Sequence, residues 1–283
     1  GLEFAHRNLP EIKHLFSPNA YFIDATYAAP LYDSFAPNDP MTRHDDLKFK
    51  RELSRFAANL FGIHGSETGM AFGVPESHFL EGILSGKPLV KDFPNPTALG
   101  IPLFSLLFHD CIAMYPHQGD RVGIGDARKI LNCLIHGAMP LYDIPPRPYW
   151  KTHSSEPNLN DPNFCFVRYQ GGWGEDQHPV DRFIKNTYEF LSPFCEAVAT
   201  IPMTDHRFLK EDRSVELSRF GDHWQVVVNY GPNDYQYGQT ILPAMGFLVL
   251  GPEFLAQHFY PRYGTSRTSL IIKNRAKSYL GFQ

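Results

Sequence analysis

Acidic side chains stand at the ends of three apolar runs in the sequence. Asp24 follows the run "AYFI", Glu67 ends "LFGIHGSE", and His109 with Asp110 ends "IPLFSLLFHD". If these runs are consecutive parallel strands, as in a β/α barrel, their carboxyl ends meet on the face where active sites lie. A facing pair of carboxylates is what glycoside hydrolysis requires, because one group attacks or stabilises the anomeric carbon while the other protonates the leaving oxygen. Asp24 and Glu67 are therefore candidate catalytic residues.

Each of these residues also has an ordinary structural explanation. Asp24 could cap a turn or a helix, and Glu67 could be a solvated loop acid. His109 and Asp110 could be a hydrogen-bonded pair that ends a strand, or they could bind sugar hydroxyls from the third strand end. The coincidence of all three in one repeating pattern favours a site.

Other residues lie where a sugar could meet them. Tyr27, on the loop after Asp24, could contact a sugar ring or only pack. Trp173, in "QGGWGEDQ", could stack on a sugar or be an aromatic side chain on the rim. His64 lies three residues before Glu67, so alternation along a strand turns the two side chains to opposite faces. We therefore expect His64 to be packed rather than catalytic.

The elements that must position these residues follow a repeating order over residues 1–204. A short apolar run is followed by a polar, glycine-rich loop and then by an amphipathic helix. The continuous run over 101–110 is typical of a strand buried on both faces. The predicted helices are 43–59 with Thr42 as N-cap, 126–136 with Asp126 as N-cap and Gly137 at its end, and 179–199 interrupted near Pro193.

The character of the sequence changes after residue 204. The stretch "SVELSRFGDHWQVVVNYG" predicts two strands joined by a Gly-Asp turn, and "QTILPAMGFLVLG" predicts one or two more. We expect a partial (β/α) barrel over residues 1–204 and a small antiparallel β-sandwich domain over residues 205–283.

Composition excludes several classes of protein. The chain has 283 residues, 43% of them hydrophobic, and a net charge of −4, so it is neither disordered nor broadly basic, and no nucleic-acid partner is expected. No apolar run approaches the roughly 18 residues of a membrane helix, so no membrane partner is expected. The cysteines are widely spaced and contain no C-x-x-C pair, which favours reduced thiols over a disulfide framework: Cys111, Cys133, Cys165 and Cys195.

Four stretches resemble the second half of the catalytic barrel in glycoside hydrolase family 129. This family contains α-N-acetylgalactosaminidases related to the endo-α-N-acetylgalactosaminidases of mucin breakdown. The resemblance covers about residues 20–250, and "IPLFSLLFHDCIAMYP" is its most distinctive piece. The other pieces are "YFIDATYAAPLYDSF", "HGSETGMAFGVPESHFLEG" and "LNCLIHGAMPLY".

The resemblance implies a retaining glycosidase that acts on α-linked N-acetylgalactosamine. At the matching positions, Asp24 would be the nucleophile and Glu67 the acid/base. Another α-glycosidase on the same scaffold and a non-catalytic carbohydrate-binding protein remain alternatives. The substrate would be a carbohydrate or a glycopeptide.

One departure from the family concerns the start of the chain. A full barrel needs roughly 250 residues and eight strands, whereas Asp24 comes almost at once. We therefore expect only the C-terminal half of a (β/α)8 TIM-type barrel, with the N-terminal half as a missing partner segment, and doubtful activity of this chain alone. The sequence requires no cofactor. The family leaves calcium open, but the chain has no D-x-D-x-D-G run, so metal ligands stay unassigned. The free thiols favour the cytoplasm, whereas the substrate class would also permit secretion.

Overall fold

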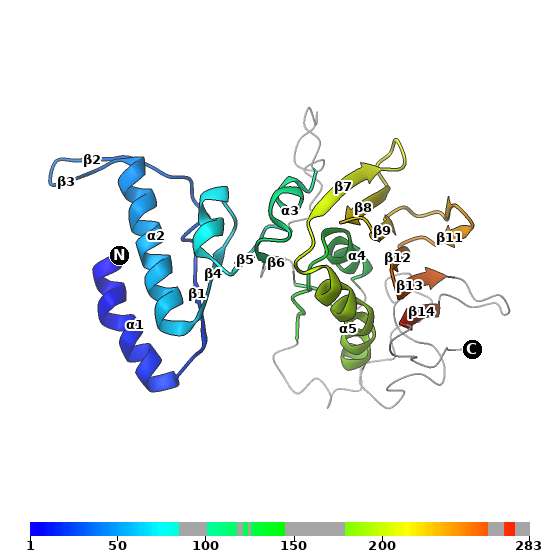
Figure 1. Ribbon diagram of the computed structural model, residues 1–283, viewed down its shortest axis with the longest axis horizontal. Helices are drawn as coiled ribbons and strands as arrows, with labels where there is room; N and C mark the ends of the chain where they lie inside the picture. The colour runs from blue at the N-terminus through cyan, green and yellow to red at the C-terminus, as the bar shows by residue number, and fades with distance from the viewer. Residues whose placement is uncertain (85–100, 118–120, 124–125, 145–178, 260–268, 275–283) are drawn as a thin grey trace. The chain divides into compact units, whose positions relative to one another are not determined.

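The computed structural model describes residues 1–84, 101–117, 121–123, 126–144, 179–259 and 269–274 (Figure 1). The chain forms two compact units, each with its own sheet. The first comprises Gly1–Ser85 and Cys111–Gln118, and the second comprises Gly86–Asp110 and Gly119–Gln283. The fold is therefore a mixed α/β fold with one parallel sheet and antiparallel sheets. The predicted division at residues 204 and 205 stays a prediction.

The first unit is built on a four-stranded parallel sheet in the order β1-β4-β5-β6. Helices α1 and α2 pack against each other, and α2 also packs on β1 and β4 (Figure 1). The elements are α1 Leu2–Phe16, β1 Ala20–Ile23, β2 Ser34–Ala36, β3 Asp39–Met41, α2 Arg43–Phe61, β4 Ile63–Glu67, the 3-10 helix η1 Ala71–Glu76, β5 Phe79–Glu81 and β6 Ala113–Tyr115.

The two faces of this sheet differ in what covers them. On one face Tyr21 and Ile23 join a core with Ala57 and Phe61 of α2, and the Tyr21 and Phe61 rings stack at 4.4 Å. Because side chains alternate along a strand, Phe22 points to the other face, where 39% of its surface stays exposed. The second face is therefore the more open one.

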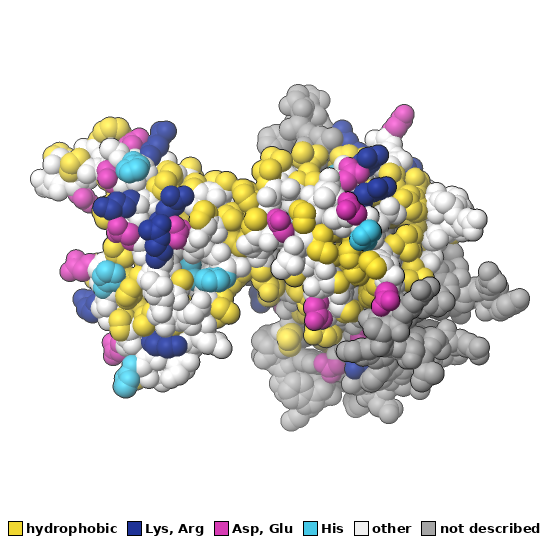
Figure 2. Space-filling model, viewed as in Figure 1, with side chains coloured by type: hydrophobic (Ala, Val, Ile, Leu, Met, Phe, Trp, Pro, Cys, Tyr) yellow, Lys and Arg dark blue, Asp and Glu magenta, His cyan; other side chains and the backbone are white. Residues whose placement is uncertain are grey.

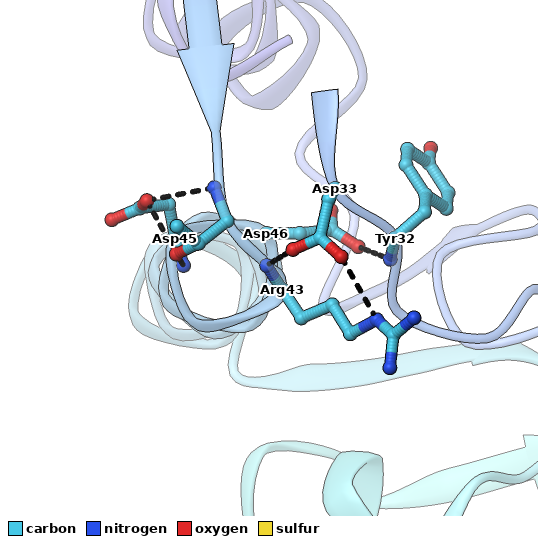
Figure 3. Close-up of polar contacts among 6 residues, drawn as sticks. Tyr32, Asp33, Arg43, Asp45 and Asp46 are labelled. Carbon is cyan, nitrogen blue, oxygen red and sulfur yellow. Dashed lines mark hydrogen bonds and ion pairs between the residues drawn. The ribbon is translucent and has the colours of Figure 1, made fainter. Parts of the chain in front are cut away.

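The N-terminus of α2 fixes the loop that follows β1. Thr42 and Asp45 form the reciprocal capping box, and the hydrogen bonds from Thr42 hold the pKa of the Asp45 carboxyl below its usual range. Figure 3 shows the carboxylate of Asp33 on Arg43, accepting from its backbone N–H at 2.8 Å and lying 3.2 Å from its Nε. The backbone N–H of Tyr32 points to Asp46. The predicted helix and its N-cap are confirmed.

The second unit packs helices on a six-stranded antiparallel sheet in the order β14-β13-β12-β9-β8-β7. Val226 and Val228 of β9 share one core with α4 and α5, whereas Val227 points to the opposite face, where β10 and β11 pack. The elements are α3 Leu103–Phe108, α4 Ala127–His136, α5 Pro179–Val198, β7 Met203–Phe208, β8 Val215–Phe220, β9 Trp224–Asn229, β10 Tyr235–Tyr237, β11 Thr240–Leu242, β12 Phe247–Gly251, β13 Phe254–Phe259 and β14 Ser269–Asn274.

Two predicted elements need correction. The run over 101–110 is not a strand, because residues Leu103–Phe108 form α3. Leucine and phenylalanine dominate this run and β-branched residues are scarce, so its composition suits a helix, and the Phe104 and Phe108 rings meet one turn apart at 4.8 Å. Helix α5 continues through Pro193 without interruption. Its buried face beside the proline compensates for the lost backbone hydrogen bond: Phe190, Leu191, Phe194 and Cys195.

The surface charges of the first unit are mixed in sign, and the described cysteines form no disulfide (Figure 2). On the face shown in Figure 2, acidic and basic side chains of the first unit are interspersed and do not gather into a patch of one sign. No helix in the described part of the chain is long and apolar enough to span a membrane. Cys111, Cys133 and Cys195 are free thiols, and Cys165 lies outside the described residues. The absence of a nucleic-acid partner and of a membrane partner stays a prediction.

Candidate active site

The backbone register places Asp24 beside Glu67. Strands β1 and β4 are parallel neighbours whose last register pair is Ile23 with Ser66. Asp24 and Glu67 each come one residue later, so they occupy equivalent positions at the carboxyl ends of adjacent strands. Adjacent strands lie about 4.7–4.9 Å apart, so the two acids leave neighbouring strands at the same edge of the sheet.

The backbone turns in the same way after both acids. Ala25 has a φ of 57° and Thr68 a φ of 53°, so the residue directly after each acid adopts the left-handed conformation. This conformation is uncommon for residues other than glycine and is an outlier for a β-branched residue such as threonine. It costs of order 1–3 kcal/mol and concentrates at functional sites. The two turns mark this sheet edge as a candidate site.

A histidine and a third acid lie beside Glu67. His117 Nε2 is 3.0 Å from Glu67 Oε1. Glu81, 8% exposed, is the register partner of Glu67 on β5. One ligand atom from each of these three residues lies within 4.8 Å of the others. The sequence analysis missed Glu81 and His117; "HFLEG" carried the same signal of an apolar run ending in an acid, but β5 is only three residues long.

This cluster of Glu67, Glu81 and His117 also has the donor groups of a metal site. Calcium prefers six to eight oxygen ligands, whereas imidazole suits zinc, iron, copper or nickel. Two carboxylates with one imidazole therefore fit a metal ion, and the nitrogen donor favours a transition metal over calcium.

A row of aromatic rings lies on the open face of the sheet, with Phe22 and Phe79 two residues before the acids in register and Tyr115 level with Glu67 and Glu81. The Phe79 ring centroid is 6.1 Å from that of Phe22 and 6.1 Å from that of Tyr115. Gly65 lies under the Phe79 ring, and a Cβ at this position would overlap it. Because Gly65 is two residues before Glu67 on β4, the glycine lets an aromatic ring cover the sheet directly below the candidate acid.

Tyr27 lies on the opposite, helix-covered side of the sheet. It is fully buried, and its hydroxyl group is 2.7 Å from Ser54 Oγ, which is 3.1 Å from Nε2 of the buried His64. Burial raises the pKa of the Tyr27 hydroxyl, an effect that the Ser54 hydrogen bond opposes, and burial lowers the pKa of His64. Of the two possibilities for Tyr27, contact with a sugar ring or packing, this placement fits packing. His64 is packed as expected.

The remaining predicted sugar contacts belong to the second unit of the chain. His109 and Asp110 belong to the second unit and follow a helix instead of a strand. His109 is 5% exposed, with Nδ1 2.8 Å from the Ile201 carbonyl oxygen and Nε2 3.3 Å from that of Gly137. Burial lowers its pKa although both carbonyls oppose this. His109 is therefore packed and hydrogen-bonded to the backbone of its own unit. Asp110 is exposed, and Trp173 lies outside the described residues.

Comparisons with known proteins find a likeness in structure alone. No protein-family model and no curated protein sequence matches the chain. The ligand-free structure of the α-N-acetylgalactosaminidase NagBb from Bifidobacterium bifidum matches with a TM-score of 0.54 and 19% identity, over 86% of this chain and 34% of that enzyme. Its complex with GalNAc matches with a TM-score of 0.53 and 18% identity, over 86% and 34%.

The chain shares its fold with part of a glycosidase. It spans about a third of the length of that enzyme. At this identity the likeness shows the fold alone and does not show membership of glycoside hydrolase family 129.

Proposed function

We propose that the protein carrying this chain is a retaining glycoside hydrolase that acts on α-linked N-acetylgalactosamine, in glycans or glycopeptides. The observation that carries the proposal is the register of β1 and β4, since Asp24 and Glu67 are the residues that directly follow its last pair. The left-handed turn after each acid adds support. The choice of sugar rests on the structural neighbour, an α-N-acetylgalactosaminidase that has been solved with GalNAc.

The reaction proceeds by two displacements. The Asp24 carboxylate forms a bond to the anomeric carbon while Glu67 gives its proton to the glycosidic oxygen. The bond between the anomeric carbon and the glycosidic oxygen breaks in the same step. The sugar is then held on Asp24 as a β-glycosyl ester. Glu67 next takes a proton from water, the water oxygen attacks the anomeric carbon, and Asp24 leaves as a carboxylate. Two inversions give a product with retained configuration.

The parallel sheet forms part of a (β/α)8 barrel in this proposal. Strand β1, helix α2 and strand β4 make one β-α-β unit, with the acids at the strand ends where barrel active sites lie. The open face that carries Phe22 and Phe79 corresponds to the barrel interior. The strands that complete the barrel belong to a segment outside this chain, in keeping with the 34% share of the neighbour that the chain covers.

Stereochemistry with azide tests the proposal in the full-length protein. On an activated aryl α-N-acetylgalactosaminide, Glu67→Ala still forms the glycosyl ester, which azide attacks to give the α-azide. Asp24→Ala cannot form the ester, so azide attacks the substrate directly and gives the β-azide. Glu52→Gln, which alters an exposed acid on α2, is the matched control and keeps full activity.

The outcomes separate the candidate functions. Opposite azide anomers from the two variants would assign both roles. Turnover of an aryl α-galactoside but not of the N-acetylgalactosaminide would mean another α-glycosidase. Sugar binding without turnover of either would mean a carbohydrate-binding protein and would refute the proposal.

A further inference from the structure

His117 lies just after β6 and contacts the candidate acid/base, which is 50 residues earlier in the chain. Its Nε2 is 3.0 Å from Glu67 Oε1, and both side chains are partly buried, at 34% and 21% exposed. A carboxylate oxygen can only accept, so the imidazole carries its hydrogen on Nε2 and donates when Glu67 is ionised. Oε1 is therefore engaged, and Oε2 is the oxygen left for the sugar.

The backbone behind this contact is fixed by the ends of three strands. The backbone N–H of Thr68, directly after Glu67, donates to the Glu81 carbonyl at 2.5 Å. The N–H of Gly82 donates to the Tyr115 carbonyl at 2.9 Å, two residues before His117. Gly82 has a φ of 93°, which suits glycine, and a Cβ there would lie 3.5 Å from His117 Cδ2. The imidazole thus lies close to the backbone of Gly82.

Glu81 explains why Glu67 needs a fixed partner. The two carboxylates are register partners, and their cluster with His117 spans at most 4.8 Å between ligand atoms. When both carboxyl groups are ionised, their like charges repel at this distance. This repulsion would rotate the Glu67 carboxylate away from Glu81 and away from the glycosidic oxygen. A hydrogen bond from His117 opposes that rotation.

We propose that His117 is a positioning residue that holds the carboxyl group of Glu67 so that Oε2 exchanges the proton with the glycosidic oxygen. This inference rests on the proposed function. It concerns proton transfer only, because His117 contacts Glu67 and Asp24 performs the attack.

The test compares two leaving groups in the full-length protein and in the variants His117→Leu and His117→Gln. Departure of a phenol needs a proton from Glu67, whereas departure of a dinitrophenol does not. For His117→Leu we expect kcat/KM on the phenyl glycoside to fall by about 10²-fold. On the dinitrophenyl glycoside we expect kcat/KM of His117→Leu to stay within about threefold of the wild-type value. Its kcat and KM should fall together, because the later attack of water still needs Glu67 as base. Gln carries its amide N–H near the place of Nε2 and restores most of the phenyl activity.

Controls and contrary outcomes are distinct. His14→Leu, an exposed histidine on α1, should behave as the wild type on both substrates. Equal losses on the two substrates would mean a merely structural role, and a Gln variant as slow as Leu would mean that the hydrogen bond is not the cause. A metal ion bound stoichiometrically by the wild type and lost in both variants would make His117 a metal ligand. Each of these results overturns the inference. A wild type inactive on both glycosides would instead refute the proposed function.

Discussion

Ser54 links the loop that follows Asp24 to the strand that carries Glu67. Its hydroxyl group lies between the Tyr27 hydroxyl, at 2.7 Å, and His64 Nε2, at 3.1 Å, and all three side chains are fully buried. Ser54→Ala removes both hydrogen bonds at once. The bridge joins the loop after β1, helix α2 and strand β4, so its loss should loosen the two elements that hold the acids.

The expected cost follows from the two groups left behind. A buried polar group that loses its hydrogen-bond partner costs about 1–3 kcal/mol, so two such groups give about 2–6 kcal/mol. Tyr27→Phe removes only one bond and leaves Ser54 with His64, so we expect about 1 kcal/mol. In the double variant the two effects should not add, because Ser54→Ala then strands only one group.

Hydrogen exchange of backbone amides in β4 and α2 measures this cost within the first unit. A loss of about 3 kcal/mol accelerates exchange by about 10²-fold where exchange follows local opening, while amides of the second unit serve as an internal reference. Ser66→Ala in β4 is the matched control, since this serine is also buried in the first unit but its Oγ has no hydrogen-bond partner among the described residues. If Ser54→Ala and Ser66→Ala changed exchange equally little, the Ser54 bridge would contribute nothing to stability and the reasoning would be refuted.

Two further predictions concern a close packing contact and a buried histidine. Gly65→Ala forces the Phe79 ring away, so we expect a loss of about 1–3 kcal/mol by thermal unfolding; Phe79→Leu should recover part of it, and an unchanged Tm would contradict the packing. Burial lowers the pKa of His136 to about 3 from its ordinary 6.5, so the unfolded state binds the proton first. The free energy of unfolding should not be reduced by this histidine above pH 6.5. Below that pH it should fall by about 1.4 kcal/mol per pH unit. Urea unfolding at several pH values measures the slope; His136→Gln should reduce it, leaving the part due to His109, and an unreduced slope would contradict the assignment.

The elements that the sequence predicted correctly are those with strong local signals. Helices α2 and α4 have Thr42 and Asp126 as their N-caps, as predicted, because a capping side chain satisfies a backbone N–H at a fixed position. Gly137 ends α4 in the left-handed conformation that favours glycine. The runs that became β1, β4, β8 and β9 were also recognised, since alternation or continuous apolar character over four to six residues is a local property.

What escaped prediction depends on contacts between distant residues. The contact of Glu67 with His117 and its pairing with Glu81 come from strand order, and β5 and β6 each have only three residues. The burial of Tyr27 could not be predicted either, because it depends on a contact with Ser54 in a helix that starts well after Tyr27 in the sequence. The apolar run over 101–110 was ambiguous, since a buried strand and a short helix look alike without periodicity.

The backbone after the two acids shows how the fold overrides local preference. Neither alanine nor threonine favours a positive φ, yet Ala25 and Thr68 both adopt one at the ends of adjacent, in-register strands. The strain can persist because neighbouring contacts hold it: Thr68 donates to the Glu81 carbonyl, and the Ala25 carbonyl accepts from Ala28. An ordinary strand end gains nothing from such a turn. Here it takes the chain out of the sheet directly after each acid, so Asp24 and Glu67 are the last side chains at this edge before the loops begin.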